Sequence, residues 1–245
     1  MSGDRPGSGP DRFDTPPPHG ETATPGIGAD DSGSHRDEPR HGAFSWPPGD
    51  GLGVVSAFAE TWRDATFRPA SFFGRLPATG GMGPALVYYL VIGVIVAGIQ
   101  LFWNVVLQAA GLRQPLPWPA ELGGVGPWMD IISFLLSPLI LLVLLLASGG
   151  VTHLLLLLFG GAHGGFQRTL QVFAYAYSPQ TFAVVPWIGP VVGSIWMVVI
   201  AVIGLREGHG TDGWRAALAV LLPVAAALGF FVVLGLIAGL AMGGL

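Results

Sequence analysis

Amide and phenol side chains repeat every four residues in two otherwise apolar stretches: Gln100, Asn104 and Gln108 in the first, and Gln167, Gln171 and Tyr175 in the second. A four-residue repeat places side chains on one face of a helix. Because an amide in hydrocarbon is costly unless it is paired, each face must meet protein or water. The spacing predicts hydrogen bonds between the two helices, worth about 0.6 kcal/mol each, or a polar path for a solute. No acidic residue or arginine lies on either face, which favours the hydrogen bonds over coupled transport.

His153 falls inside an apolar stretch, and an ionisable group at membrane depth is a candidate functional residue. It lies close to one end of its stretch, which favours a neutral, hydrogen-bonded structural role. A membrane hydrolase would need a serine opposite it, and Ser194 is the candidate. His163 and His209 are expected in loops, without a neighbouring set of metal-ligand spacing. The sequence therefore predicts no catalytic residue, no cofactor site and no metal site.

The composition is that of a membrane protein. Hydrophobic residues make up 51% of the chain and charged residues 11%, against about 25% charged residues in soluble domains. Five apolar stretches are each about long enough to cross a hydrocarbon core of ~30 Å: residues 84–107, 131–159, 166–185, 188–205 and 216–241. The sequence predicts an all-α, polytopic bundle of five transmembrane helices. The absence of cysteine excludes disulfides and Cys-ligated metals.

The chain divides into a tail and a membrane domain. Residues 1–50 are rich in Pro, Gly, Asp, Ser and His, so they are predicted to form a disordered cytoplasmic tail. This tail is either a docking segment for a cytoplasmic partner or a solubilising extension. Residues 51–245 form the membrane domain. The first strongly apolar run starts near Pro84, so no cleavable signal peptide is expected.

A short amphipathic helix is predicted before the first span, within residues 52–76. Its apolar stripe consists of Leu52, Val55, Phe58, Ala59 and Trp62. This pattern predicts a helix lying in the headgroup region. The aromatic residues Trp62, Phe67, Phe72 and Phe73 are expected to be interfacial anchors. The alternative is that they pack on the bundle.

The arginines predict the orientation. A cytoplasmic N-terminus and five crossings place six of them on the inside, namely Arg63, Arg68, Arg75, Arg168, Arg206 and Arg215, and Arg113 outside. This asymmetry obeys the positive-inside rule and puts the C-terminus outside. Lysine is absent, which indicates a GC-rich bacterial genome and hence the bacterial inner membrane.

Prolines and glycines indicate where the spans bend or approach one another. Ser137-Pro138 is either a helix start or a kink in the long second span, and Pro179 should bend the third. Gly235, Gly239 and Gly243 repeat every four residues, as do Gly189 and Gly193. Such spacing lets helix backbones approach closely, either within one chain or in a homodimer.

Two ligand classes are excluded by motif. The glycine-rich segments contain no phosphate-binding loop of the GxxxxGK[ST] type. The chain has no basic patch, so nucleic acid is not an expected partner.

Residues 51–245 resemble the Yip domain family, named for Rab/Ypt-interacting membrane proteins, in its bacterial form. The residues that carry the resemblance are Gly164-Gly165, Thr169-Leu170, Tyr175, Tyr177-Ser178-Pro179, Pro186-Trp187-Ile188-Gly189-Pro190, Ile195-Trp196, Ile203-Gly204-Leu205-Arg206-Glu207-Gly208-His209, Arg215-Ala216 and Ala219-Val220-Leu221-Leu222-Pro223, preceded by Trp62, Phe67-Arg68-Pro69 and Phe72-Phe73. The resemblance implies a five-span bundle with a cytoplasmic N-terminus. Eukaryotic relatives recruit Rab-type GTPases and help to shape membranes.

These observations lead to a functional hypothesis. The chain is expected to be a non-enzymatic adaptor or organiser of membrane proteins or lipids. Its partners would be the bilayer and a membrane or cytoplasmic protein. The alternative is a transporter or permease component that uses the polar faces of spans one and three. The positions expected to matter structurally are Tyr175, Pro179, Pro186, Gly189, Trp196 and Gly204.

Overall fold

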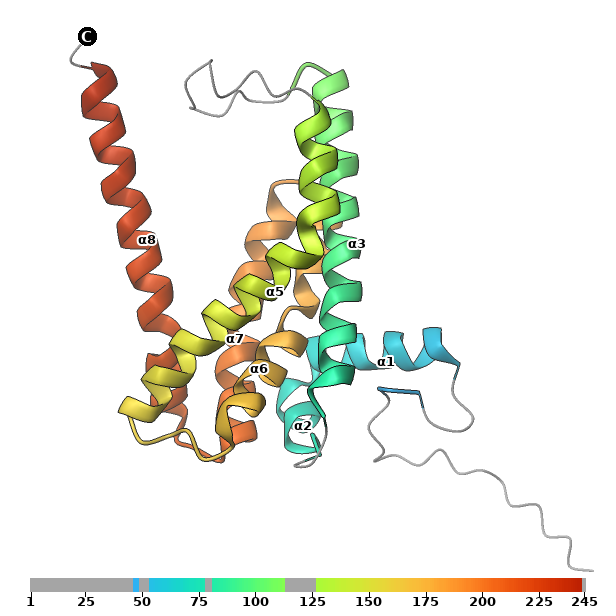
Figure 1. The fold of residues 1–245 in the computed structure, drawn as a ribbon, viewed down its shortest axis with the longest axis vertical. Coiled ribbons are helices and arrows are strands. Elements are labelled where there is room, and N and C mark those ends of the chain that lie inside the picture. The colour runs from blue at the N-terminus through green and yellow to red at the C-terminus, as the bar shows by residue number, and fades with distance from the viewer. Residues whose placement is uncertain (1–45, 49–52, 78–80, 113–126, 244–245) are drawn as a thin grey trace, which may run out of the picture. The chain divides into compact units, whose positions relative to one another are not determined.

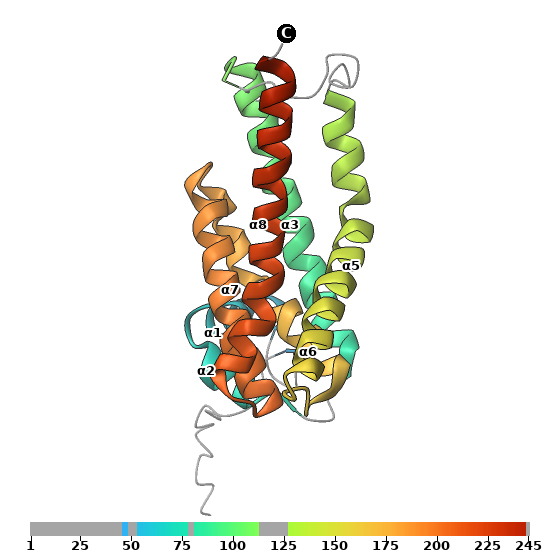
Figure 2. The ribbon, with the colours of Figure 1, turned by 90° about the vertical axis from the view of Figure 1, so that its left-hand side faces the viewer.

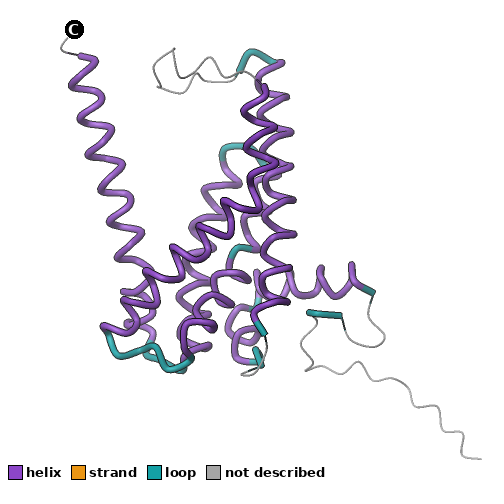
Figure 3. The backbone as a smooth tube through the Cα atoms, in the orientation of Figure 1, coloured by secondary structure: helices purple, strands orange, loops and turns teal. Residues whose placement is uncertain are grey.

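The structure is a computed structural model that describes residues 46–48, 53–77, 81–112 and 127–243. Its elements are α1 (Val54–Phe67), α2 (Pro69–Gly74), α3 (Met82–Ala109), α5 (Pro127–Leu158), α6 (Gly165–Ala176), the 3-10 helix η1 (Ser178–Val184), α7 (Ile188–His209) and α8 (Gly213–Gly243). The described residues contain no strand, as Figure 3 shows. The prediction of an all-α fold is confirmed. All of the predicted tail except residues 46–48 lies outside the described residues.

Four single helices are long and apolar enough to cross a membrane. They are Met82–Ala109, Trp128–Leu158, Ile188–His209 and Gly213–Leu240. They correspond to the first, second, fourth and fifth predicted spans, so a multi-pass membrane protein is confirmed. The predicted third span, residues 166–185, is wrong as a single helix, because the structure divides it into α6 and η1.

Pro179 explains the division of the third span. Proline lacks the backbone N–H that would continue the helix, and it disfavours helical backbone in the residue before it. The α-helix accordingly ends at Ala176, and Pro179 occupies the first turn of η1. The sequence predicted a bend within one helix here, whereas the structure changes from an α-helix to a 3-10 helix across Tyr177.

The segment α6–η1 and helix α7 form an antiparallel hairpin with a glycine-lined seam. Its facing pairs are Phe182 with Gly189, Pro179 with Gly193, Val172 with Gly204, and Arg168 with Gly208. From pair to pair, the residue number falls along α6–η1 as it rises along α7. The two arms are therefore in contact along the whole length of α7. The two arms lie side by side in Figures 1 and 2. Glycine at these positions lets the two backbones touch.

The connection at the end of the hairpin is tight. Trp187 has a positive φ of 62°, an unusual conformation for a residue with a side chain. Its indole is exposed, while Pro186 before it is half-buried. The hairpin closes here, and α7 starts at the next residue, Ile188.

The second span is one continuous helix, α5, with Pro138 inside it. Pro138 cannot donate to the carbonyl of Phe134, four residues earlier. The hydroxyl of Ser137 donates to that carbonyl instead, with an Oγ–O distance of 2.7 Å. The helix bends along its length rather than starting anew, as Figure 1 shows. The kink is therefore the correct alternative of the two that the sequence left open.

The two short helices pack on the bundle through aromatic residues. Phe72 and Phe73 are buried, and the Phe72 ring meets Tyr175 at a centroid distance of 5.1 Å. The half-buried Trp62 donates from Nε1 to the carbonyl of Ser178 at 3.2 Å. The expectation that these three are interfacial anchors is wrong, and the alternative of packing on the bundle holds. Phe67 alone of the four is exposed.

The buried face of α1 also differs from the predicted stripe. Ala57, Thr61 and Ala65 face the bundle and are fully buried, whereas Val55 is 81% exposed. Small residues on the inner face allow α1 to approach the bundle closely, as the glycines do in the α7 seam.

Trp46 belongs to the packed part of the chain, although it falls inside the predicted tail. Its Nε1 donates to the carbonyl of Pro84 at 2.8 Å, and its ring contacts Phe58 and Tyr88. The indole thereby joins the segment before α1 to the start of α3.

Helix α8 packs along its first turns only. Ala216, Ala219 and Val220 are buried, whereas the large apolar side chains from Leu221 to Leu240 are exposed. Gly235 and Gly239 of the glycine repeat fall in this exposed part, and a methyl group at either would meet nothing within 4 Å. The predicted close packing of Gly189 and Gly193 is confirmed within one chain, whereas the described chain offers the α8 repeat no partner.

The hairpin seam yields a matched test. Gly189→Ala should lower the free energy of unfolding by about 1–3 kcal/mol, because its methyl group would overlap the carbonyl of Phe182. Gly235→Ala in α8 should be neutral or stabilising, since alanine favours helix and nothing lies nearby. Thermal unfolding of both variants in detergent measures the difference. Equal melting temperatures would contradict a closely packed seam.

Candidate functional site

A groove lies between α3 and α5. It has a volume of about 250 Å³ and is lined by Gly93, Val96, Ala97, Gln100, Leu101, Asn104, Asp130, Ser133, Phe134, Ser137, Ile140, Leu141 and Tyr177. The two helices run antiparallel, so Asn104 meets the first turn of α5 while Gly93 meets Leu141 further along it. The polar lining residues recur at intervals of three to four on each helix, which aligns them along the groove.

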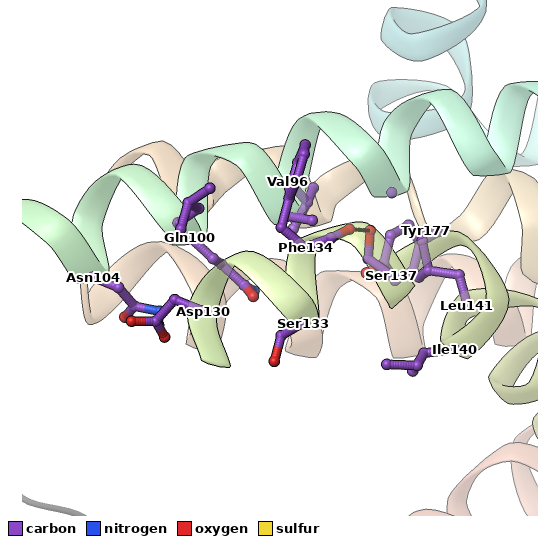
Figure 4. A pocket seen from close by; sticks show the side chains of 13 residues that line it. Val96, Gln100, Asn104, Asp130, Ser133, Phe134, Ser137, Ile140, Leu141 and Tyr177 are labelled. Carbon is purple, nitrogen blue, oxygen red and sulfur yellow. Dashed lines mark hydrogen bonds between the residues drawn. The ribbon is translucent and has the colours of Figure 1, made fainter. Parts of the chain in front are cut away.

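The polar side chains converge at one end of the groove. Asn104 donates from Nδ2 to Oδ1 of Asp130 at 3.3 Å. Figure 4 shows the side chain of Gln100 extending from α3 toward Asp130 and Ser133 of α5. Deeper in, Ser137 and Tyr177 add hydroxyl groups between the apolar side chains of Phe134 and Leu141. The groove is thus polar at one end and mixed at the other.

The two predicted polar faces do not meet. Gln100 and Asn104 lie against α5, and Gln108 lies one turn beyond the groove and is exposed. Gln171 is buried elsewhere and donates from Nε2 to the carbonyl of Gly81 at 3.4 Å. The predicted hydrogen bonds between spans one and three therefore form only in part: Gln171 reaches the N-terminal end of α3, whereas Gln100 and Asn104 do not face span three. The amides of the first span face the second, because α5 contributes polar residues that the sequence analysis did not weigh.

Tyr175 contributes to an aromatic cluster instead of a polar face. Its ring lies 5.1 Å from that of Tyr88 in α3. The hydroxyl of Ser178 donates to the carbonyl of Tyr175 at 2.6 Å, so the Tyr88 hydroxyl must donate to Ser178, at 2.7 Å. This cluster joins spans one and three beside the single amide bond from Gln171 to Gly81.

A second polar site joins three segments through histidine. His153 of α5 and His209 of α7 both hydrogen-bond the hydroxyl of Thr169 in α6, each at 3.0 Å. The backbone N–H of Gly164 donates to Nδ1 of His209 at 3.0 Å. His153 was expected to be hydrogen-bonded, and its bond to Thr169 agrees with that expectation. His209, expected in a loop, is instead the buried last residue of α7.

The bond from Gly164 fixes the proton positions in this site. Because Nδ1 of His209 is an acceptor, the proton of the neutral ring lies on Nε2 and is donated to Thr169. The Thr169 hydroxyl can then donate to Nδ1 of His153. The side chain of Thr169 is fully buried, so a substrate cannot reach this hydroxyl. The network is suited to holding α5, α6 and α7 together rather than to catalysis.

The proposed pair of His153 and Ser194 does not form. Ser194 lies near the start of α7 and accepts from Nε2 of Gln180 at 3.3 Å. His153 lies at the other end of the hairpin, beside His209. Among the described residues, no group of three His, Cys, Asp or Glu side chains could hold a metal ion.

Sequence reasoning missed several of these residues. Asp130, Ser133 and Ser137 recur at spacings of three and four, so they share one face of α5. That pattern was available in the sequence. Thr169 carried no comparable signal, because its role depends on histidines that lie 16 and 40 residues away.

The histidine network can be tested with two Thr→Val variants. Thr169→Val should lower the free energy of unfolding by about 1–3 kcal/mol, because it leaves ring nitrogens buried without a partner. The control is Thr66→Val, since Thr66 is equally buried and its hydroxyl has no hydrogen-bond partner among the described residues. The control variant should be neutral or stabilised. Equal losses in thermal unfolding would contradict the network.

Comparison with known proteins gives one match. The sequence model of the Yip1 domain matches residues 64–235, more than two-thirds of the chain. Neither a curated protein nor a solved structure matches it. The match covers α3, α5, α6, η1 and α7, and most of α8. The chain therefore belongs to the Yip1 domain family of membrane proteins.

Proposed function

We propose that this protein is a non-enzymatic organiser of the membrane that presents α1, held rigidly on its bundle, to lipids and to a membrane or cytoplasmic protein partner. The observation that carries the proposal is the division of α1 into two faces. One face is fixed to the bundle, and the other is exposed and partly apolar. A helix that only anchored the chain would need no such fixed orientation.

The inner face of α1 is held by indole hydrogen bonds. Trp62 donates to the carbonyl of Ser178 and also to Oγ1 of Thr181, at 3.0 Å. Trp196 of α7 donates to the carbonyl of Thr66 at 2.8 Å. Both bonds connect α1 to segments more than 110 residues away in the sequence. The helix therefore has a defined rotation about its axis.

The outer face of α1 combines apolar and charged side chains. Val55 and Phe67 are each more than half exposed, and the exposed Arg63 lies one turn before Phe67 on the same side. Apolar residues beside a basic residue suit the interface between headgroups and acyl chains. The face is equally suited to the apolar surface of a partner protein at that depth.

We also propose that α6–η1 provides a fifth crossing. This segment runs beside α3, since Gln171 contacts Gly81 and Val184 accepts from Nε1 of Trp103. Between Gly81 and Trp103, α3 rises about 33 Å at 1.5 Å per residue, which matches a hydrocarbon core of ~30 Å. A broken crossing is compatible with the bilayer where protein buries it.

The arginines support an N-terminus in the cytoplasm and a C-terminus outside, in a bacterial inner membrane. Arg168 donates to the carbonyl of Pro77, and Arg215 donates to that of Gly160. These contacts bring the segment after α2 to the start of α6, and the end of α5 to the start of α8, on one side of the bundle. Basic residues concentrated there satisfy the positive-inside rule.

The transporter alternative is less well supported. It requires the polar faces of spans one and three to share a path, but the contact between Tyr88 and Tyr175 lies between these helices. The groove of α3 and α5 contains only the first of the two faces.

Cysteine labelling can test the fifth crossing, because the chain has no native cysteine. Trp187→Cys should react with a membrane-impermeant maleimide in intact cells. His163→Cys should react only after permeabilisation, although both positions are exposed. The reason is that α6–η1 separates the two positions by one crossing. Labelling of both positions under the same condition would show that α6–η1 does not cross.

Photo-crosslinking from α1 tests the organising function. A photoreactive residue at Val55 or Phe67, on the outer face, should capture lipid and one discrete protein. The same residue at Phe58, which contacts Trp46 and Tyr88, should crosslink within the chain. Mass spectrometry identifies the products. Identical crosslinked products from Phe58 and from the outer-face positions would contradict the proposal that the outer face of α1 contacts a partner.

A further inference from the structure

The groove between α3 and α5 contains polar side chains that the described part of the chain does not pair. Gln100, Ser133 and Tyr177 line the groove, and none of their side chains makes a hydrogen bond to another described residue. Helices α3 and α5 are otherwise apolar and long enough to cross a membrane. An amide or hydroxyl group in hydrocarbon is costly unless it is hydrogen-bonded. These three side chains therefore call for a polar partner inside the groove.

The groove extends from a membrane interface to about the middle of the bilayer. Asn104 bonds to Asp130 at one end, and Gly93 contacts Leu141 eleven residues further along each helix. Eleven residues rise about 16 Å, or roughly half of a hydrocarbon core of ~30 Å. Asn104 is near the end of α3 and Asp130 is near the start of α5. Their end of the groove thus lies at an interface.

The deep end of the groove is closed by packed side chains. Gly93 lies directly against the side chain of Leu141. The hydroxyl of Tyr89 donates to the carbonyl of Leu141 at 3.1 Å, and the Tyr89 ring lies 5.0 Å from that of Tyr177. Three segments of the chain meet at this point. The groove therefore ends here and does not continue to the opposite interface.

The lining calls for a partner that both donates and accepts hydrogen bonds. The amide of Gln100 and the hydroxyls of Ser133 and Tyr177 can each do both. The hydroxyl of Ser137 gives its hydrogen to the carbonyl of Phe134, so its oxygen can still accept. An acyl chain can do neither, and a lipid headgroup at the interface does not reach the middle of the bilayer. Water meets both requirements and is small enough to reach the closed end.

We propose that this groove holds a file of water molecules that enters at the interface beside Asp130 and ends at Tyr177. The volume of about 250 Å³ has room for several waters, since each takes about 30 Å³ in the liquid. Ser133 and Ser137 are one helical turn apart, so a polar group recurs about every 5.4 Å along α5. Because the groove is closed at its deep end, the water hydrates one half of the membrane and does not cross it.

Cysteine reactivity tests the proposal, because the chain has no native cysteine. The full chain is purified and placed in lipid nanodiscs, and a charged methanethiosulfonate is added. A thiol reacts as the thiolate, which forms only in contact with water, so Ser133→Cys should react roughly tenfold faster than Ile132→Cys or more. Ile132 is exposed, lies nearer the interface and does not line the groove. Equal rates, measured by mass spectrometry, would overturn the proposal.

A second pair of variants tests how deep the water reaches. Ala97 lines the groove, and the antiparallel register places the exposed Leu136 at nearly the same depth outside it. Ala97→Cys should again react roughly tenfold faster than Leu136→Cys. Adding Ser133→Leu, which narrows the groove nearer the interface, should slow the reaction of Ala97→Cys several-fold. An unchanged rate would overturn entry from this interface. Ser133→Cys is nearly isosteric, so it decides the question if Ala97→Cys does not fold.

The lipid of the nanodisc separates water from a bound headgroup. The difference between Ser133→Cys and Ile132→Cys should be the same in phosphatidylcholine and in phosphatidylglycerol, because water is present in both. A difference that appears with only one of these lipids would assign the groove to that headgroup and overturn the proposal. None of these positions lies in α1 or in α6–η1, so the crosslinking and topology tests can fail or succeed independently.

Discussion

The break between α6 and η1 is the constraint on which the rest of the structure depends. Backbone groups that leave helical geometry at membrane depth must find partners within the protein. Here the side chains of α1 and α3 supply them. Trp62 donates to the carbonyl of Ser178, and Trp103 donates to that of Val184. On the other side, the glycines of α7 bring a second backbone into contact with η1.

This constraint explains why α1 is part of the bundle rather than an appendage. Its tryptophan satisfies a carbonyl of the broken crossing, and its small residues allow the approach that this bond requires. The same hydrogen bond therefore fixes the position of α1 and satisfies a carbonyl group at the junction of α6 and η1. The polar groove is separate from it, since α3 and α5 form the groove almost alone.

The sequence predicted the elements that depend on local composition. Four long apolar helices, the short helix before them and the glycine contacts of Gly189 and Gly193 follow from hydropathy, helical spacing and residue size. The change from α-helix to 3-10 helix at Pro179 could not be separated from a simple bend, because the outcome depends on donors supplied by distant residues. The proline in α5 illustrates the difference, since Ser137 allows that helix to continue.

The candidate sites were harder to predict, because they depend on which helices are neighbours. The amide face of Gln100 and Asn104 was visible in the sequence, but its partner was assigned to span three instead of α5. The same limitation applied to the aromatic residues before the first span, which suit a membrane interface and a protein core equally well. His209 was missed because its burial depends on the loop at Gly164.

The hydroxyl of Ser137 has a consequence for the redesign of the groove. It lines the groove and also satisfies the carbonyl that Pro138 leaves without a donor. An engineer who replaced every polar lining residue with leucine would strip this carbonyl of its partner and weaken the helix itself. Position 137 therefore tolerates only a side chain that can donate a hydrogen bond backward along the helix. As long as Pro138 remains, the groove keeps one polar group whatever ligand it is built to hold.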